Sequence, residues 1–303
     1  MRFAWLAACA ALFFSGAATA QCPRAVPGER PTLTRESQYS VIFIRRHGPC
    51  ATLSFRRAGA DYLESYSNIT DPTELPLPYT RAMTLGFAHA ARAESVLAIG
   101  VGAGTTIGYT ARYLPRARVT AVDIDPVIIE LARDYFRLRR FESANLTLAA
   151  ADGRRFLQRS EARYDIIQLD AFLGGYIPEH LLTLEFFRLA RSRLAPGGAL
   201  VANLHHGTRL FESTVATMRR AFPSVTLYRS GGNVIAIAQE AALSPGALGA
   251  RAANRQAVYR FRYPLAPLLG ARMNYNPPAN TRILTDDFSP ANQFEAMAPR
   301  RSR

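Results

Sequence analysis

The sequence predicts an α/β protein with a doubly wound, mostly parallel sheet and a small N-terminal β unit. From residue 95 onward, apolar runs of strand length alternate with segments of helical periodicity, and glycine or proline residues separate them. Five such strands are followed by two more, residues 226–229 and 234–238, which pair about Gly231 and Gly232 as a hairpin. Strand–helix–strand units closed by an antiparallel pair indicate a seven-stranded sheet with helices on both faces.

The order of the elements gives the domain division. Three short β-type runs, residues 39–45, 51–56 and 61–66, predict a small antiparallel unit, and a helix is expected over residues 79–92. The expected parallel strands are 96–99, 119–122, 146–149, 164–169 and 199–203, and the later helices are 105–114, 126–136, 179–194 and 211–222. We divide the chain into residues 1–20 as a signal peptide, 21–77 as an N-terminal arm and small β domain, 78–240 as the sheet domain, and 241–303 as a C-terminal extension that packs on this core.

The composition narrows the function classes. The chain has 303 residues, is 49% hydrophobic and carries a formal charge of +14. No lysine is present, so all 37 basic residues are arginines, and a Schiff-base or general-base lysine is excluded. The arginines are scattered rather than clustered with aromatic residues, which favours a solvated surface over a nucleic-acid footprint. We expect no nucleic-acid partner.

The N-terminus indicates export. Residues 1–20 contain one early arginine, an apolar stretch and an A-x-A pattern before Gln21, which is the form of a cleaved secretory signal peptide. This predicts an exported, periplasmic protein without stable membrane insertion after cleavage; an uncleaved membrane anchor is the alternative. The remaining cysteines, Cys22 and Cys50, would pair as a disulfide in an oxidising compartment, and two unrelated thiols are the alternative.

Polar features at three successive strand ends predict a nucleoside site. Gly100-Val101-Gly102-Ala103-Gly104 follows the first strand of the sheet, Asp123 ends the second, and Asp152-Gly153 follows the third. Ile107 stands where a pyrophosphate-binding loop has its last glycine, and no GKT or GKS triphosphate pattern occurs. A neutral or cationic adenosyl ligand fits this pattern. Turn glycines and helix-capping aspartates are the alternative reading.

Asp170 follows the fourth strand, in the stretch DAFLGGYIPEHL, and is either a catalytic carboxylate or the polar end of a strand. Tyr79 and Tyr176 would wall the acceptor side, or are core or rim aromatics. The neighbouring residues His205 and His206 lack the ligand spacing of a metal site, so we expect no metal.

Five stretches in order carry a resemblance to a known family: VLAIGVGAGTT, VTAVDIDPVIIELAR, ADGRRFL, YDIIQLDAFLGGYIPEHLLTLEFF and LAPGGALVANL. Together they resemble the spermidine synthase-like proteins, which are polyamine aminopropyltransferases and their relatives. The resemblance covers about residues 35 to 295. It implies the Rossmann-like fold of the class I S-adenosylmethionine-dependent methyltransferases.

The resemblance also implies roles for particular residues. The adenosyl ligand would be bound by Gly100, Gly102, Gly104, Asp123, Ile124, Asp152 and Gly153. Asp170 matches the first aspartate of the family's D-[ST]-[ST]-D-P motif, which helps to deprotonate the attacking amine. The implied co-substrate is S-adenosylmethionine or its decarboxylated form, the acceptor is a small amine or another small molecule, and relatives are often homodimers.

Three departures from the family pattern concern the acceptor. Ala103 replaces the aspartate that grips the aminopropyl ammonium, Arg81 replaces a glutamate that meets the polyamine, and Leu173 replaces the second aspartate of the motif. If Arg81 points into the pocket, it repels a cationic polyamine and favours an acidic or neutral acceptor.

The sequence therefore leaves three functions open. The first is an aminopropyltransferase-like enzyme with the polyamine-binding carboxylates missing. The second is an S-adenosylmethionine-dependent methyltransferase with a non-polyamine acceptor. The third is a non-catalytic exported protein that binds a nucleoside or a partner. Export itself raises a conflict, because adenosyl sulfonium compounds are made in the cytosol.

Overall fold

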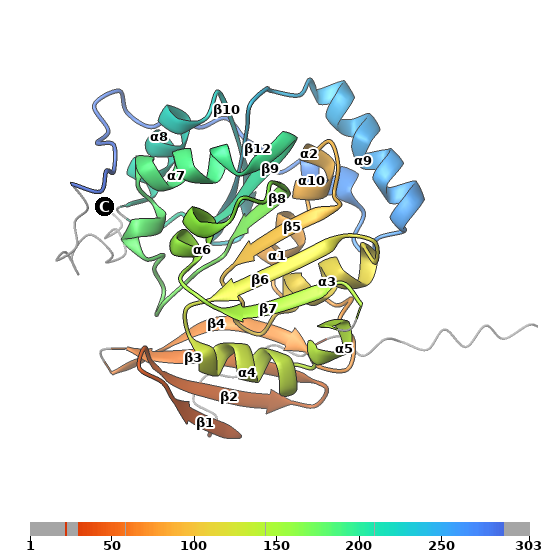
Figure 1. The fold of residues 1–303 in the computed structure, drawn as a ribbon, viewed down its shortest axis with the longest axis vertical. Coiled ribbons are helices and arrows are strands. Elements are labelled where there is room, and N and C mark those ends of the chain that lie inside the picture. Colours follow the sequence, from red (N-terminus) through yellow and green to blue (C-terminus); the bar gives the residue numbers. More distant parts are fainter. Residues whose placement is uncertain (1–21, 23–29, 58, 143, 209, 288–303) are drawn as a thin grey trace, which may run out of the picture.

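The structure is a computed structural model that describes residues 22, 30–57, 59–142, 144–208 and 210–287. The expected signal peptide lies outside the described residues. Two sheets form the framework (Figure 1), with the small sheet set against the end of the large one at which the parallel strands stop. Within the described part of the chain, no helix is long and apolar enough to cross a bilayer.

The small sheet has four antiparallel strands in the order β1-β2-β3-β4. Their bounds are β1 Leu33–Glu36, β2 Val41–His47, β3 Cys50–Arg57 and β4 Ala60–Asn68. Three of them correspond to the predicted runs, and β1 is an addition from the segment assigned to the arm. Its side chains are mostly exposed, so it has none of the apolar alternation that signals a strand from sequence.

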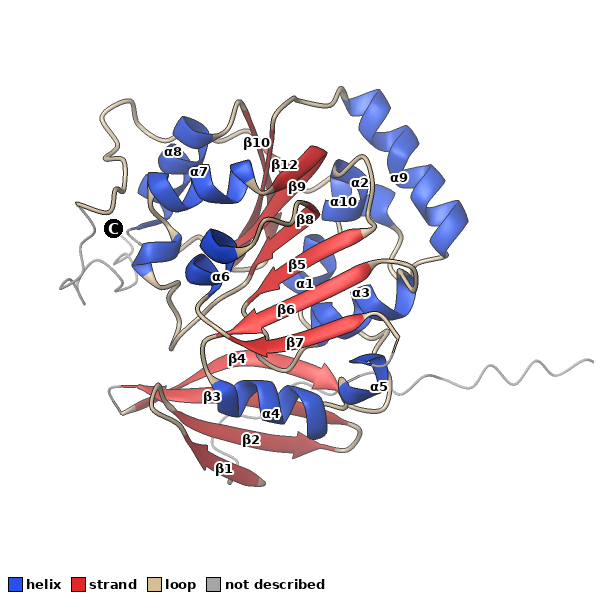
Figure 2. Cartoon of the chain, viewed as in Figure 1, coloured by secondary structure: helices blue, strands red, loops and turns tan. Residues whose placement is uncertain are grey.

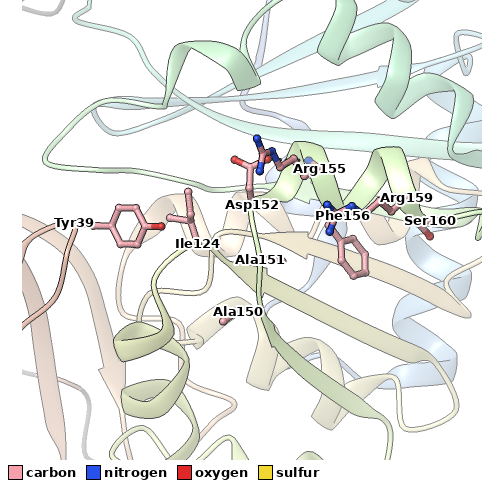
Figure 3. A pocket seen from close by; sticks show the side chains of 9 residues that line it. All are labelled: Tyr39, Ile124, Ala150, Ala151, Asp152, Arg155, Phe156, Arg159 and Ser160. Carbon is pink, nitrogen blue, oxygen red and sulfur yellow. Dashed lines mark hydrogen bonds between the residues drawn. The ribbon is translucent and has the colours of Figure 1, made fainter.

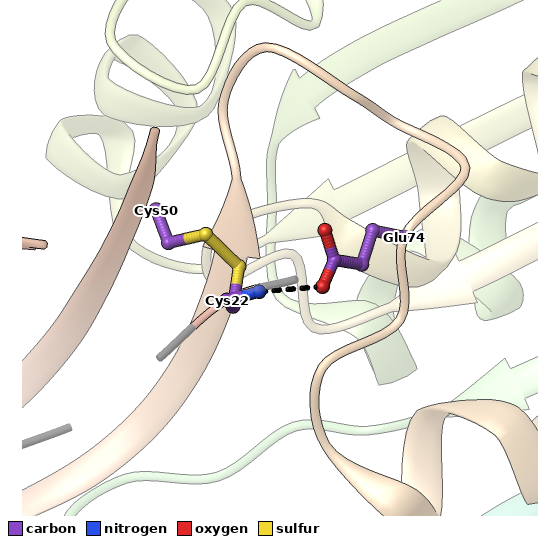
Figure 4. A group of neighbouring side chains, drawn as sticks. All are labelled: Cys22, Cys50 and Glu74. Carbon is purple, nitrogen blue, oxygen red and sulfur yellow. Dashed lines mark hydrogen bonds between the residues drawn. A yellow bond between two sulfur atoms is a disulfide. The ribbon is translucent and has the colours of Figure 1, made fainter. Parts of the chain in front are cut away.

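The predicted disulfide between Cys22 and Cys50 is present. It ties Cys22 to the first residue of β3, and the backbone N–H of Cys22 donates to Glu74 Oε1 at 2.7 Å (Figure 4). Because Glu74 also accepts from Asn68 Nδ2 at 2.8 Å, Cys22, the end of β4 and the linker to the large sheet are joined at one point.

The large sheet has eight strands in the order β12-β10-β11-β9-β8-β5-β6-β7. Their bounds are β5 Ser95–Ile99, β6 Arg118–Asp123, β7 Leu146–Ala150, β8 Tyr164–Leu169, β9 Leu194–His205, β10 Ser224–Ser230, β11 Asn233–Gln239 and β12 Arg272–Met273. The strands from β9 to β7 are parallel to one another. Beyond β9, each of β11, β10 and β12 pairs antiparallel with the strand before it in the sheet. The predicted α/β class and mostly parallel sheet are confirmed. The eighth strand, β12, has only two residues, which is too short for a sequence pattern to reveal.

Helices cover both faces of this sheet (Figure 2). They are α1 Pro78–Met83, α2 Gly86–His89, α3 Thr105–Tyr113, α4 Pro126–Asp134, α5 Arg139–Glu142, α6 Gly153–Arg159, α7 Leu184–Ser192, α8 Leu210–Ala221, α9 Pro245–Tyr259 and α10 Leu265–Leu269. Side chains of α1–α4, α9 and α10 share one apolar core, and those of α6–α8 share the other. Successive residues of β5 alternate between the two cores, as the pleat of a strand buried on both faces requires.

The helix expected over residues 179–194 begins later than predicted. Residues Glu179–Leu181 form a single 3₁₀ turn, and α7 starts after Thr183, whose hydroxyl oxygen accepts from the backbone N–H of Phe186 at 3.3 Å. This N-cap separates the helix from residues 170–181, so that segment is a loop free to line the end of the sheet.

Candidate active site

A cavity of about 270 Å³ lies where β5, β6, β7 and β8 end, and β4 of the small sheet borders it. Ligands in doubly wound sheets bind at this edge, because the loops there diverge and leave a crevice. The cavity is lined by these predicted site residues: Gly100, Gly102, Asp123, Ile124, Asp152, Gly153 and Asp170. The structure thus gathers into one cavity residues that lie far apart in the chain, from Gly100 to Asp170.

Two glycines of the loop after β5 are packed too tightly to carry side chains. Gly100 has φ +92°, and a Cβ there would lie 2.3 Å from the carbonyl oxygen of Asp170. A Cβ on Gly102, at φ +52°, would lie 2.4 Å from Ser65 Oγ. These two glycines let the loop meet both the Asp170 segment and β4.

Gly104 has a role in helix packing. It does not line the cavity; it precedes α3 with φ +70°, and a Cβ there would lie 2.3 Å from Leu138 Cδ1. Its small size therefore serves helix packing, and its contact with an adenosyl ligand stays a prediction.

Asp123 is held by backbone donors at the end of β6. Its Oδ2 accepts from the Val101 N–H at 2.8 Å and its Oδ1 from the Asp125 N–H at 3.0 Å. Burial raises the pKa of Asp123, and these backbone hydrogen bonds oppose the rise. The backbone N–H of Gly102 also acts on this carboxylate, so Asp123 keeps at least one lone pair with which to accept a ligand hydroxyl.

Asp125 also lines the cavity, although the sequence analysis did not select it. Its Oδ1 caps α4 by accepting from the Val127 N–H at 2.9 Å. Its Oδ2 is buried and has no hydrogen-bond partner among the described residues. A buried oxygen without a partner is unfavourable, so a ligand hydroxyl donating to it would remove that cost, and the site fits a ribose on this ground.

Asp152 combines the capping role and the site role that the sequence left as alternatives. Its Oδ1 caps α6 by accepting from the Arg155 N–H at 2.8 Å, and its Oδ2 lies 2.8 Å from His180 Nε2. His180 lines the same cavity and was missed, because residues 179–180 were expected in a helix. The adjacent Gly153 is required for packing: a Cβ there would lie 2.2 Å from Ile99 Cγ2.

Asp170 lies at the centre of a partly buried polar network. Its carboxylate accepts from Asn203 Nδ2 at 2.8 Å and from the Tyr79 hydroxyl. Asn203 Oδ1 in turn accepts from Asn233 Nδ2 at 2.9 Å, which leaves the Asn203 amide nitrogen to face Asp170. Burial raises the pKa of Asp170 to about 6, and the hydrogen bonds from Asn203 and Tyr79 oppose this rise. A carboxyl with that pKa is ionised at neutral pH and can accept a proton.

Glu64, on β4, adds a carboxylate that the sequence analysis did not select. It lines the cavity, and its Oε1 accepts from the backbone N–H groups of Gly174 and Gly175 at 2.9 and 3.3 Å. Burial raises its pKa to about 7, and the negative charges of Asp170 and Asp123 add to the rise. No local sequence pattern predicts that Glu64 belongs to the site, because the sequence of β4 does not indicate which part of the large sheet it packs against.

The remaining predicted acceptor residues are placed differently. Arg81 does not line the cavity: its Nε donates to the Leu75 carbonyl at 2.7 Å, and its guanidinium lies over the Tyr263 ring, 4.6 Å from the centroid. The condition under which Arg81 would repel a cationic acceptor, that its side chain points into the pocket, is therefore not met. Tyr176 lines a separate small hollow beside His205. Tyr79 meets the site through Asp170 rather than by lining the cavity.

The charge of the cavity is opposite to that of the chain. Five carboxylates line it, and among the described lining residues there is no arginine, although the chain carries +14. The carboxylates are Glu64, Asp123, Asp125, Asp152 and Asp170. Two arginines, Arg155 and Arg159, line an adjoining hollow beyond Asp152 (Figure 3). The cavity itself therefore favours a cationic ligand.

The fold and the site together define an α/β protein with a carboxylate-lined cavity at the end of the parallel strands of its large sheet. The spermine/spermidine synthase domain model matches residues 79–230. A polyamine aminopropyltransferase of Vibrio vulnificus is 31% identical over 273 residues, covering 85% of this chain and 89% of the relative. A solved probable spermidine synthase from Corynebacterium glutamicum has a TM-score of 0.62 at 23% identity, covering 82% of this chain and 98% of that one. A spermidine synthase in complex with the transition state analogue AdoDATO has a TM-score of 0.60 at 16% identity, covering 82% of each chain.

The chain belongs to the spermine/spermidine synthase family and is a transferase of the polyamine aminopropyltransferase type. This family uses decarboxylated S-adenosylmethionine as its aminopropyl donor and acts on small amines.

Proposed function

We propose that this protein transfers an aminopropyl group from decarboxylated S-adenosylmethionine to a small aliphatic amine, with Asp170 as the general base. The observation that carries this proposal is the cavity lined by five carboxylates and, among its described residues, by no arginine. Donor and acceptor are both cationic before reaction, so such a lining stabilises them and disfavours an acidic acceptor.

The residues present fit the donor. Asp123 and the unpartnered Asp125 Oδ2 would accept the ribose hydroxyls, and Asp152 would lie at the adenine end. The donor supplies a carbon activated by its sulfonium: the amine nitrogen bonds to this carbon, the carbon–sulfur bond breaks, and its electron pair leaves with methylthioadenosine. Asp170 would accept the proton that the amine loses, while Tyr79 and Asn203 hold its carboxylate in place.

Methyl transfer from S-adenosylmethionine is the second candidate, and Ala103 favours it. This residue stands where aminopropyltransferases have a donor-binding aspartate, and it is buried. The charge of the cavity argues against methyl transfer, because the carboxylates that line it would repel the additional carboxylate of S-adenosylmethionine.

Calorimetry of the purified chain separates these functions. We expect decarboxylated S-adenosylmethionine to bind at least tenfold more tightly than S-adenosylmethionine, because the cavity repels the additional carboxylate. Product formation with a panel of aliphatic diamines and triamines then identifies the acceptor. Tighter binding of S-adenosylmethionine would replace this proposal by methyl transfer. No heat with either compound or with methylthioadenosine would exclude both transferase functions.

We also propose that the protein is exported to the periplasm. The form of residues 1–20 and the disulfide between Cys22 and Cys50 support this, since disulfides persist mainly in oxidising compartments. Cell fractionation with N-terminal sequencing should find a periplasmic chain that begins at Gln21. A full-length cytosolic chain with both thiols open to alkylation would show that the proposal is wrong.

A further inference from the structure

Glu64 reaches the cavity from outside the large sheet. It belongs to β4, whereas the four other carboxylates of the cavity lie at or just beyond the ends of strands of the large sheet. Its neighbour Ser65 fixes β4 against the glycine loop, because Ser65 Oγ accepts from the Ala103 N–H at 3.1 Å. The Glu64 side chain is thus held beside the loop that lacks a carboxylate of its own.

Only one oxygen of the Glu64 carboxylate is occupied by the protein. Oε1 accepts from the N–H groups of Gly174 and Gly175, whereas Oε2 has no hydrogen bond within the described part of the chain. Residues 171–177, which follow Asp170, contain no charged side chain that could neutralise Glu64. The charged groups that act on it are Asp170 and Asp123, both negative.

These two neighbours place Glu64 along the length of a bound donor. Asp123 marks the ribose, and Asp170 marks the amine that attacks. The aminopropyl chain must run between them, because its reacting carbon is bonded to the sulfonium beside the ribose and faces the base-bound amine. Glu64 lines this cavity and contacts the segment after Asp170 at Gly174, while its neighbour Ser65 contacts the glycine loop that also donates to Asp123. Its carboxylate therefore lies near this middle part of the donor rather than near the adenine.

We propose that Glu64 binds the primary ammonium of the aminopropyl group, through Oε2, and so selects the decarboxylated donor over S-adenosylmethionine. This inference rests on the proposed function. Glu64 would supply from the small sheet the negative charge that the loop lacks at Ala103. An ammonium between Glu64, Asp170 and Asp123 would also relieve the repulsion among these three carboxylates.

The variant Glu64→Gln tests this role. Glutamine keeps an oxygen that can accept from Gly174 and Gly175, so the loop stays in place while the charge is removed. By calorimetry, we expect affinity for decarboxylated S-adenosylmethionine to fall about 10- to 100-fold, because a charge-assisted hydrogen bond is lost. Affinity for methylthioadenosine, which has no aminopropyl group, should change less than about twofold, so selectivity for the amine should collapse.

Glu36→Gln is the matched control. Glu36 is an exposed residue of β1 in the same small sheet, and its replacement by glutamine changes the net charge by the same amount. It should bind both compounds as the wild type does. Equal weakening of both compounds by Glu64→Gln would show that Glu64 only positions the loop. Unchanged binding of the decarboxylated donor by Glu64→Gln would also overturn the inference. If the wild type itself does not bind this donor, the proposed function fails as well.

Discussion

Replacing Asp170 by asparagine should lower turnover at least about 100-fold while the donor still binds. Asparagine has nearly the same shape and keeps an oxygen for the Asn203 donor, but its side chain cannot accept a proton from the amine. Product formation at saturating donor and acceptor measures the loss, and calorimetry with methylthioadenosine measures the binding. Asp134→Asn, on the exposed surface of α4, is the matched control and should retain full turnover.

The pH dependence provides a second test of Asp170. Its pKa of about 6 means that activity should fall as the pH drops below about 6, because the carboxyl is then protonated and cannot act as a base. If activity persists in Asp170→Asn with the wild-type pH profile, another group is the base.

Stability should respond in the opposite direction to activity. The folded-state pKa of Asp170 is raised from 3.8 to about 6, so ionisation opposes folding above pH 6 and has no such effect below about pH 4. Asp170→Asn should therefore raise the free energy of unfolding at neutral pH, by up to ~3 kcal/mol, and this gain should disappear below about pH 4. Urea unfolding at pH 4 and pH 7.5 measures it, and a loss of stability at neutral pH would contradict the assigned cost of burying this charge.

The large sheet and its strand-end residues could be predicted because their signals are local. An apolar run followed by a polar residue or a glycine identifies the end of a parallel strand, and all such ends meet at one edge of the sheet. Asp123, Asp152 and Asp170 were selected in this way, and all three line the cavity.

The rest of the site depends on contacts between distant segments. Glu64 meets the loop at Gly174 across 110 positions of the chain, and His180 meets Asp152 across 28. The Arg81 side chain turns away to Leu75 and Tyr263, which no motif around residue 81 reveals. A family motif gives the position of a residue along the chain. The direction of its side chain depends on the packing of its neighbours.

Of the glycine-to-alanine substitutions around the cavity, Gly100→Ala should disrupt the site most. The new Cβ would lie 2.3 Å from the Asp170 carbonyl oxygen, 2.6 Å from its carbonyl carbon and 2.7 Å from Ala171 Cα. All three are backbone atoms, so no side-chain rotation relieves the overlap and the chain that carries the base must move. A φ of +92° adds strain for any residue with a side chain.

Gly231→Ala separates overlap from backbone strain. Gly231 lies in the turn between β10 and β11 with φ +63°, and a Cβ there would have nothing within 4 Å. This variant should lose about 1–2 kcal/mol of stability from strain alone and keep wild-type affinity for methylthioadenosine. Gly100→Ala should lose roughly 3–5 kcal/mol, the sum of strain and overlap, and bind methylthioadenosine at least about tenfold more weakly. Urea unfolding and calorimetry on both variants measure these effects. If the two variants have equal stabilities and equal affinities for methylthioadenosine, the glycine loop and the Asp170 segment are not in contact. The proposed general base, Asp170, would then not be held close to the nucleoside.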